Sequence, residues 1–230
     1  VLASVIATII GGLLGIFIYE YKRLAVPVMV VVNFLYTIPS ISMLGLLLYV
    51  SGVGNTTAII ALVIYALLPM VRNTFTGLNQ IDQSMCEAGI ALGLTRIQRL
   101  WNIEIPLAMP TIMAGIRTML VMTIALTGIA SFIGAGGLGV AIYRGITTNQ
   151  SALTIAGSLL IALLAITVDA LFSLGERVTR ISPHMKRYTI IFVSIMMIIA
   201  MGIGGWAMYC RHVKTDVIHI ATKPMTEQLI

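Results

Sequence analysis

Long uncharged apolar runs alternate with short polar intervals along the chain. A helix that crosses a bilayer needs about 20 residues, and most of the runs have about this length. One run is roughly twice as long, and it divides at 51–55, where glycines and an asparagine mark a turn. The pattern therefore predicts six transmembrane helices, at 1–19, 25–50, 55–72, 107–132, 152–173 and 188–209.

The interval Asp82–Pro106 is too polar to cross the membrane. Each charge at bilayer depth costs roughly 2.5 to 3.5 kcal/mol, and the interval carries Asp82, Glu87, Arg96, Arg99 and Glu104. We therefore expect it to lie in water.

Two short helices are predicted within this interval. Ser84 with Glu87, and Thr95 with Gln98, have the spacing of a capping box, which satisfies the first free N–H groups of a helix. Gly93 separates the helices and allows a sharp turn. The apolar residues on both helices favour either a knob that binds another protein or an amphipathic hairpin on the lipid headgroups.

Composition identifies the chain as an integral membrane protein. Of its 230 residues 59% are hydrophobic and 10% are charged, far below the roughly 25% of soluble domains. The net charge of +6 is explained by basic loops on the cytoplasmic side, so no nucleic-acid partner is expected. Four of the 14 basic residues fall on the external side, namely Arg144, Arg211, Lys214 and Lys223. This orientation places Asp82–Pro106 in the cytoplasm and the C-terminus outside.

The polar interval resembles the EAA loop of ABC importer permeases, whose pattern is E-A-A-x3-G-x9-I-x-L-P. This sequence carries the positions of the pattern as Glu87, Ala88, Gly89, Gly93, Ile103, Ile105 and Pro106. Gly89 replaces an alanine and Ile105 a leucine. The resemblance implies a coupling helix that docks into a separate cytoplasmic ABC ATPase. We expect Glu87 to cap its helix and meet a basic group of that ATPase, and Gly93 to lie in a turn without room for a side chain.

The resemblance also implies an all-α membrane fold. Residues 1–180 are similar to the five-helix core of type I importer permeases, with the coupling loop at 82–106. Further motifs are typical of the glycine betaine, carnitine and choline branch, or of the related ergothioneine uptake branch; they are T-I-P-S at 37–40, L-L-P-M-V-R-N-T at 67–74 and I-G-A-G-G-L-G at 133–139. Residues 181–211 would add one extra C-terminal transmembrane helix with its cytoplasmic lead-in.

The last segment, 212–230, is predicted to be a linker and the start of an external substrate-binding domain. A β-rich run is followed by Met225, Thr226 and Glu227, where Thr226 is placed to cap a helix. The alternative is a short disordered tail.

Two motifs are candidates for the translocation pathway. Gly134, Gly136, Gly137 and Gly139 follow a membrane helix and not a strand, so they do not form a dinucleotide site. They line the external mouth of the pathway or form a plain loop. Pro39 lies within a span and predicts a kink, with Thr37, Ser40 and Ser42 near enough to satisfy the break; the kink shapes either the pathway or only the packing.

The chain offers little catalytic chemistry. It has no phosphate-binding loop, because there is no lysine between Lys22 and Lys186, so ATP and Mg belong to the partner ATPase. The histidines are isolated, and neither a metal site nor a catalytic residue is expected. Cys86 and Cys210 are predicted on opposite faces of the membrane and cannot pair. Arg117 and Asp169 lie at membrane depth, where they either pair or snorkel separately to the interface.

These observations predict a permease subunit of an ATP-driven importer in a bacterial plasma membrane. It would act as a homodimer with two ATPase subunits and move a small trimethylammonium compound by alternating access. Glycine betaine, carnitine, choline and ergothioneine are the expected substrates. The alternatives are an ion-coupled secondary transporter or channel, a membrane anchor for a receptor, and an ABC permease for an amino acid or another small solute.

Overall fold

The computed structural model describes residues 1–181, with side chains described as far as residue 173. The described helices belong to one compact unit, Leu2–Thr189. In chain order they are α1 (Leu2–Glu20), α2 (Lys22–Thr37), α3 (Ser40–Ser51), α4 (Asn55–Asn79), α5 (Gln83–Ala91), α6 (Arg96–Arg99), the π-helical turn η1 (Leu100–Glu104), α7 (Ile105–Ala130), the 3-10 turn η2 (Ser131–Ile133), α8 (Gly139–Thr147) and α9 (Ser151–Ile181). The all-α prediction is confirmed for this part of the chain, whereas the predicted helix at 188–209 and the segment 212–230 lie outside it.

Within residues 1–181, four helical stretches are long and apolar enough to cross a membrane: α1, α4, the continuous stretch Arg96–Ile133 that contains α7, and Ser151–Ser173 of α9. A fifth span is formed if α2 and α3 are counted together. This agrees with a five-helix core. The turn predicted at 51–55 is also found, between the end of α3 and the start of α4.

The second span departs from its prediction as a single kinked helix at 25–50. α2 ends at Thr37, α3 begins at Ser40, and the two axes differ by 97°. Pro39 has no N–H to continue the helix, and Ile38 before it is extended, with ψ at 127°. The broken backbone is satisfied in part by side chains, since the Thr37 hydroxyl donates to the Phe34 carbonyl at 2.7 Å and the Tyr65 hydroxyl of α4 donates to the Ile38 carbonyl.

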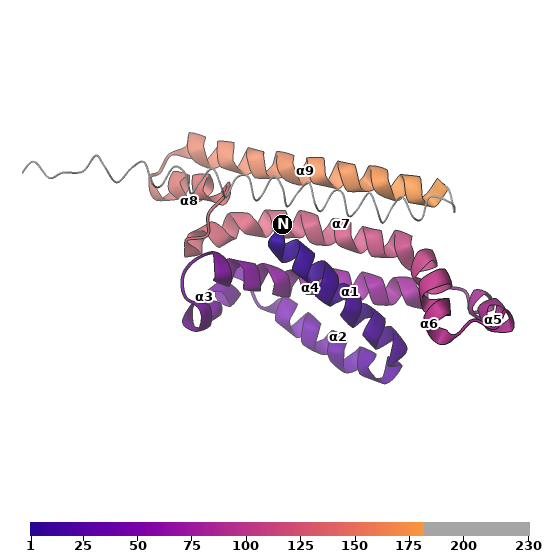
Figure 1. Cartoon of the computed structure of the whole chain (residues 1–230). Coiled ribbons are helices and arrows are strands. Elements are labelled where there is room, and N and C mark those ends of the chain that lie inside the picture. The colour runs from indigo at the N-terminus through magenta and orange to yellow at the C-terminus, as the bar shows by residue number, and fades with distance from the viewer. Residues whose placement is uncertain (182–230) are drawn as a thin grey trace, which may run out of the picture. The chain divides into compact units, whose positions relative to one another are not determined.

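α4 is the central helix of the unit, with α1 on one side and α7 on the other (Figure 1). Gly11 and Gly15 of α1 lie against Met70 and Thr74 of α4, a constant offset that makes these two helices parallel. A Cβ atom added to Gly15 would lie 2.5 Å from the Thr74 Cβ, so only glycine permits this approach. α4 continues to Asn79, beyond its predicted end at 72, because Arg72 ends the uncharged run but does not end the helix.

α7 runs antiparallel to α4 and to α9. Gly115 of α7 lies against Asn73 of α4. Nearer the end of α4, Gly77 lies against Ala108, which is nearer the start of α7. On the other side of α7, Gly128 faces Ile161 of α9. α7 therefore lies between α4 and α9. The candidate functional segments adjoin its two ends: one precedes Ile105 and the other follows Ala130.

An ion pair joins α7 to α9. The Arg117 guanidinium donates to both oxygens of Asp169, with Nε–Oδ1 at 2.5 Å and Nη2–Oδ2 at 2.6 Å. Of the two alternatives left open by the sequence, pairing is therefore the one found. The side chains are 34% and 37% exposed, so the pair lies at the edge of the helix contact and not in its core.

α8 was not predicted as a separate helix. It packs back on α9, where Gly145 approaches Thr154 and Gly157 approaches Ile142. The predicted spans end at 132 and begin again at 152, so the prediction left residues 139–147 in the interval between them, where the structure has a short helix.

Candidate functional site

The coupling segment, residues 82–106, lies beyond the ends of the long helices, where Figure 1 shows α5 and α6. Asp82 is the N-cap of α5, and its side chain accepts a hydrogen bond from the Ser84 N–H at 3.0 Å. This bond favours the charged carboxylate and lowers the pKa of Asp82. The predicted capping box of Ser84 with Glu87 is therefore wrong, because the helix begins after Asp82. Glu87 instead accepts from the Gln83 amide nitrogen at 2.9 Å, one helical turn earlier.

The second predicted capping box is confirmed. Thr95 and Gln98 bond each other's backbone N–H groups at 2.9 and 3.4 Å and start α6. Gly93 precedes this helix with φ at +74°, in the left-handed region. A Cβ atom there would have nothing within 4 Å. Gly93 is thus required by backbone conformation, and the expectation that the turn leaves no room for a side chain is wrong.

The coupling segment exposes several large apolar side chains among its polar ones. We define the coupling patch as five exposed side chains on and after α5 and α6, namely Met85, Ile90, Leu92, Ile97 and Trp101. Leu92, Ile97 and Trp101 are 79%, 71% and 63% exposed. Glu87 and Ala88 are exposed beside them on α5. Large apolar side chains grouped at the aqueous end of a membrane protein indicate a surface that another molecule covers.

The inner surface of the segment explains its small residue at Gly89. This glycine is buried, and an added Cβ would lie 2.8 Å from the Ile103 Cδ1 and 3.3 Å from the Arg99 Cγ. An alanine would require both side chains to move. Ile103 and Ile105 are half-buried, and Pro106 lies in the first turn of α7, where its missing N–H has no helical partner to lose.

Sequence reasoning missed the role of Glu104. It is 1% exposed, and its Oε1 accepts from the Arg99 Nε at 2.6 Å and from the Cys86 thiol at 3.8 Å. The hydrogen bond with Glu104 raises the pKa of Arg99, while burial and then this carboxylate raise the pKa of Cys86. Arg99 and Glu104 are five residues apart, which is the spacing of hydrogen-bonded residues in a π-helix and not in an α-helix. A search for charge pairs at α-helical spacing does not find them.

A second ion pair joins the coupling segment to α1. The Arg96 Nε lies 2.5 Å from the Glu20 Oε2. These residues are 76 positions apart in the sequence, and both belong to polar intervals that the hydrophobic pattern leaves at the same face of the membrane. Their side chains are 58% and 24% exposed, so water and salt weaken the attraction.

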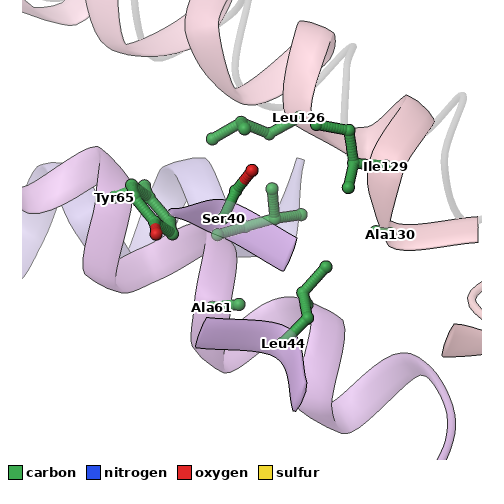
Figure 2. A pocket seen from close by; sticks show the side chains of 8 residues that line it. Ser40, Leu44, Ala61, Tyr65, Leu126, Ile129 and Ala130 are labelled. Carbon is green, nitrogen blue, oxygen red and sulfur yellow. The ribbon is translucent and has the colours of Figure 1, made fainter. Parts of the chain in front are cut away.

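At the far end of α7, the break at Pro39 adjoins a small, open hollow. Figure 2 shows its walls, which come from α3, α4 and α7 and include Ser40, Tyr65 and Ala130. The Tyr36 and Tyr65 rings meet edge to face nearby, with centroids 6.0 Å apart. The hollow is mainly apolar and contains no cage of aromatic faces.

The glycine-rich loop lies just beyond this hollow, after Ala130. The Gly136 N–H donates to the Asn55 side-chain oxygen at 3.2 Å, and Gly134, with φ at +78°, approaches Val53. Gly137 also has a positive φ, of 109°. Gly139 starts α8 so close to α7 that an added Cβ would lie 2.8 Å from the Thr127 carbonyl oxygen. The loop is therefore packed against the α3–α4 turn.

A family profile, described as "Binding-protein-dependent transport system inner membrane component", matches residues 7–181. The glycine betaine/carnitine/choline transport system permease protein OpuCD of Bacillus subtilis is 44% identical over 182 residues, which cover 79% of each chain. The ergothioneine transport permease/ergothioneine binding protein EgtU of Helicobacter pylori is 34% identical and matches the whole of this chain, which spans 43% of that protein.

The fold is similar to that of a solved structure of the MetNI methionine ABC transporter. The TM-score is 0.71 at 21% identity, with 77% of this chain and 89% of that chain covered. These matches confirm the predicted permease of an ABC importer, which is not itself an enzyme, and favour it over a secondary transporter, a channel or a simple anchor. The chain belongs to the inner membrane components of binding-protein-dependent transport systems, the multi-pass permease subunits of ABC importers.

Proposed function

We propose that this permease imports a small trimethylammonium compound and that its coupling patch docks into a cytoplasmic ABC ATPase. The coupling patch is the observation that carries the docking proposal, because it is the exposed apolar surface of a polar segment that cannot enter the bilayer. Glu87, exposed on α5 next to the patch, is available to a basic group of the partner. The residues of the EAA-like pattern then serve docking in different ways: Ala88 lies at the surface, while Gly89 and Ile103 form the inner contact.

The functional assembly in this proposal holds two copies of the permease and two ATPase subunits. ATP and Mg bind to the ATPase subunits, whose closure moves the coupling segments. Each segment passes this movement to the start of α7, and the pathway between the two permeases opens alternately to the two sides. Pro39 and the loop of Gly134, Gly136, Gly137 and Gly139 lie at the external part of this pathway.

The substrate class is supported by the names of the related proteins, which transport glycine betaine, carnitine, choline or ergothioneine. A trimethylammonium group cannot donate hydrogen bonds from its nitrogen, and aromatic faces hold it by about 2 kcal/mol or more when it is desolvated. Because the apolar hollow near Tyr65 has no such cage, we place specificity in an external binding domain. The full-length match to EgtU supports the proposal that 212–230 leads into that domain, with Met225, Thr226 and Glu227 near its start.

The substrate test uses the complete polypeptide that contains this chain, together with its ATPase, in proteoliposomes. Labelled glycine betaine, carnitine, choline and ergothioneine are offered separately with ATP and Mg inside. We expect saturable, ATP-dependent uptake of at least one of them. Uptake of an amino acid or another small solute in their place would overturn the substrate class.

The docking test compares two leucines of similar exposure. Leu92→Ala removes a side chain of the coupling patch, whereas Leu163→Ala removes one from α9 that is 62% exposed. An apolar side chain that is a hot spot of an interface costs about 1 kcal/mol or more when truncated. If the highly exposed Leu92 is such a contact, Leu92→Ala weakens ATPase copurification by roughly fivefold. Equal effects of the two variants would refute docking at this patch.

The proposed topology puts the C-terminus outside the cell. A reporter that matures only in the cytoplasm, fused after Ile230, is expected to stay dark. A fluorescent fusion would show that the C-terminus is in the cytoplasm, and therefore that the number of membrane-spanning helices is not six.

A further inference from the structure

From the geometry around Glu104 we infer that the buried Arg99–Glu104 ion pair positions the coupling helix by locking it to the start of α7, so that ATPase movement reaches the transmembrane helices. This inference rests on the proposed docking of the coupling patch. It assigns a role to two residues outside the EAA-like pattern, Arg99 and Glu104. Neither belongs to the exposed surface that would touch the ATPase.

The pair lies at the point where the coupling segment becomes a transmembrane helix. Arg99 ends α6, Glu104 ends η1, and α7 begins at the next residue. Their side chains are 13% and 2% exposed, and the Nε–Oε1 distance is 2.6 Å. A charge pair removed from water in this way holds its geometry much more strongly than an exposed pair.

The Glu104 carboxylate also gathers the other parts of the segment. Cys86 brings α5 to the same oxygen that Arg99 binds, at 3.8 Å. Gly89 of α5 lies against the stem of Arg99, which an added Cβ would approach to 3.3 Å. Tyr19, near the end of α1, lies beside the carboxylate as well. One buried acid thus connects the docking helix, the turn before α7 and the neighbouring span.

The intervening π-helical turn makes such a lock necessary. In η1 the Ile105 N–H bonds to the Leu100 carbonyl, five residues earlier. π-helical turns are rare and often mark functional sites. The wider turn brings Arg99 and Glu104 onto one face, and their ion pair closes it. Without the pair, a push on α5 would be taken up by the turn before it moved α7.

The exposed pair of Glu20 with Arg96 provides a contrast within the same segment. It also links the segment to a transmembrane helix, but its side chains are 24% and 58% exposed. An exposed pair stabilises by at most a small amount and is screened by salt. Glu20→Gln is therefore the matched control, since it removes an ion pair of the same loop without opening a buried site.

The test uses the complete importer, reconstituted with its ATPase and supplied with a transported substrate. Uptake and ATP hydrolysis are measured in the same vesicles, and hydrogen exchange of residues 96–105 is followed by mass spectrometry. The variants are E104Q, which leaves a buried arginine unpaired, and R99Q/E104Q, which removes both charges and leaves none unpaired. R99K keeps the charge with a single donor group.

We expect E104Q and R99Q/E104Q to retain the ATPase while substrate moved per ATP falls by about tenfold, within the range usual for coupling between sites. Amide exchange in 96–105 should be faster in both, R99K should recover part of the coupling, and Glu20→Gln should behave as the unmodified protein. A purely structural ion pair predicts a different result, namely that R99Q/E104Q restores what E104Q loses.

Normal coupling or normal amide exchange in R99Q/E104Q, within an intact complex, would refute this inference and leave the proposed docking standing. An unmodified permease that binds no ATPase would instead refute the docking proposal, and the inference with it.

Discussion

Gly93 offers a sharp test of what the coupling turn requires. Its φ of +74° lies in the left-handed region, and a Cβ there would meet nothing within 4 Å. Other L residues pay roughly 1 to 2 kcal/mol for this conformation. Gly93→Ala and Gly93→Leu should destabilise the turn by the same amount, because the open space accepts either side chain. Such a cost reduces the population of the native turn by a factor of roughly 5 to 30.

Three replacements and one control separate conformation from space. Gly93→Asn should be milder than Gly93→Ala, since asparagine tolerates positive φ better. Gly45→Ala is the control, because Gly45 also has open space around its Cβ position but lies within α3 at an ordinary helical φ. There alanine should be neutral or stabilise by about 0.5 to 1 kcal/mol.

The assay is ATP-driven uptake by the reconstituted importer, normalised to the amount of incorporated permease, with ATPase copurification measured in parallel. The expected order of activity is unmodified, Gly93→Asn, then Gly93→Ala and Gly93→Leu together. A Gly93→Leu variant much less active than Gly93→Ala would show that space and not backbone conformation decides, and an asparagine variant no better than alanine would contradict the role of φ.

Gly15→Ala should destabilise the permease by about 1 to 3 kcal/mol through overpacking against α4. Gly12→Ala should not, because its added Cβ approaches only the flexible end of a methionine, at 3.5 Å. Thermal unfolding in detergent measures both variants, and equal shifts in unfolding temperature would contradict the α1–α4 contact. Asp82 has a lowered pKa, so its contribution to α5 is complete above the unfolded value of about 3.9 and is lost as pH falls through the folded pKa. Protection of the α5 amides, taken relative to their intrinsic exchange rate at each pH, should therefore fall at low pH. Asp82→Asn should remove this dependence while keeping a cap; an unchanged dependence would assign it to another group. Asp169→Ala should lower the unfolding temperature, because it removes the carboxylate that accepts two hydrogen bonds from Arg117. Asp169→Asn should cost less in the same unfolding assay, and the reverse order would refute the contribution of the ion pair.

Local rules were sufficient for much of the fold. The apolar runs predicted α1, α4, α7 and α9, since the cost of inserting charges and the length of a span depend only on nearby residues. The Thr95–Gln98 capping box was correct for the same reason. At α5 both Asp82 and Ser84 are residue types that cap helices. Asp82 is the cap because its backbone is extended and the helix begins at the next residue, which the sequence pattern did not reveal. Hydropathy did not reveal α8, because its 9 residues are too few to cross a membrane and lie between two predicted spans.

Contacts between distant residues were decided by the tertiary structure alone. Glu20 meets Arg96 across 76 positions and Arg117 meets Asp169 across 52, and both contacts depend on which helices lie side by side. Pro39 in the second span predicted a kink. The angle of 97° between the axes of α2 and α3 could not be predicted, because both helices pack on α4, which is distant in the sequence. The Arg99–Glu104 pair needed a π-helical turn, which no local pattern in the sequence signals. The sequence thus determined which segments are apolar enough to span the membrane and that residues 82–106 are too polar to do so, because these properties depend on nearby residues alone. The packing of the helices determined how residues 82–106 are joined to the spans, because that depends on contacts between distant residues.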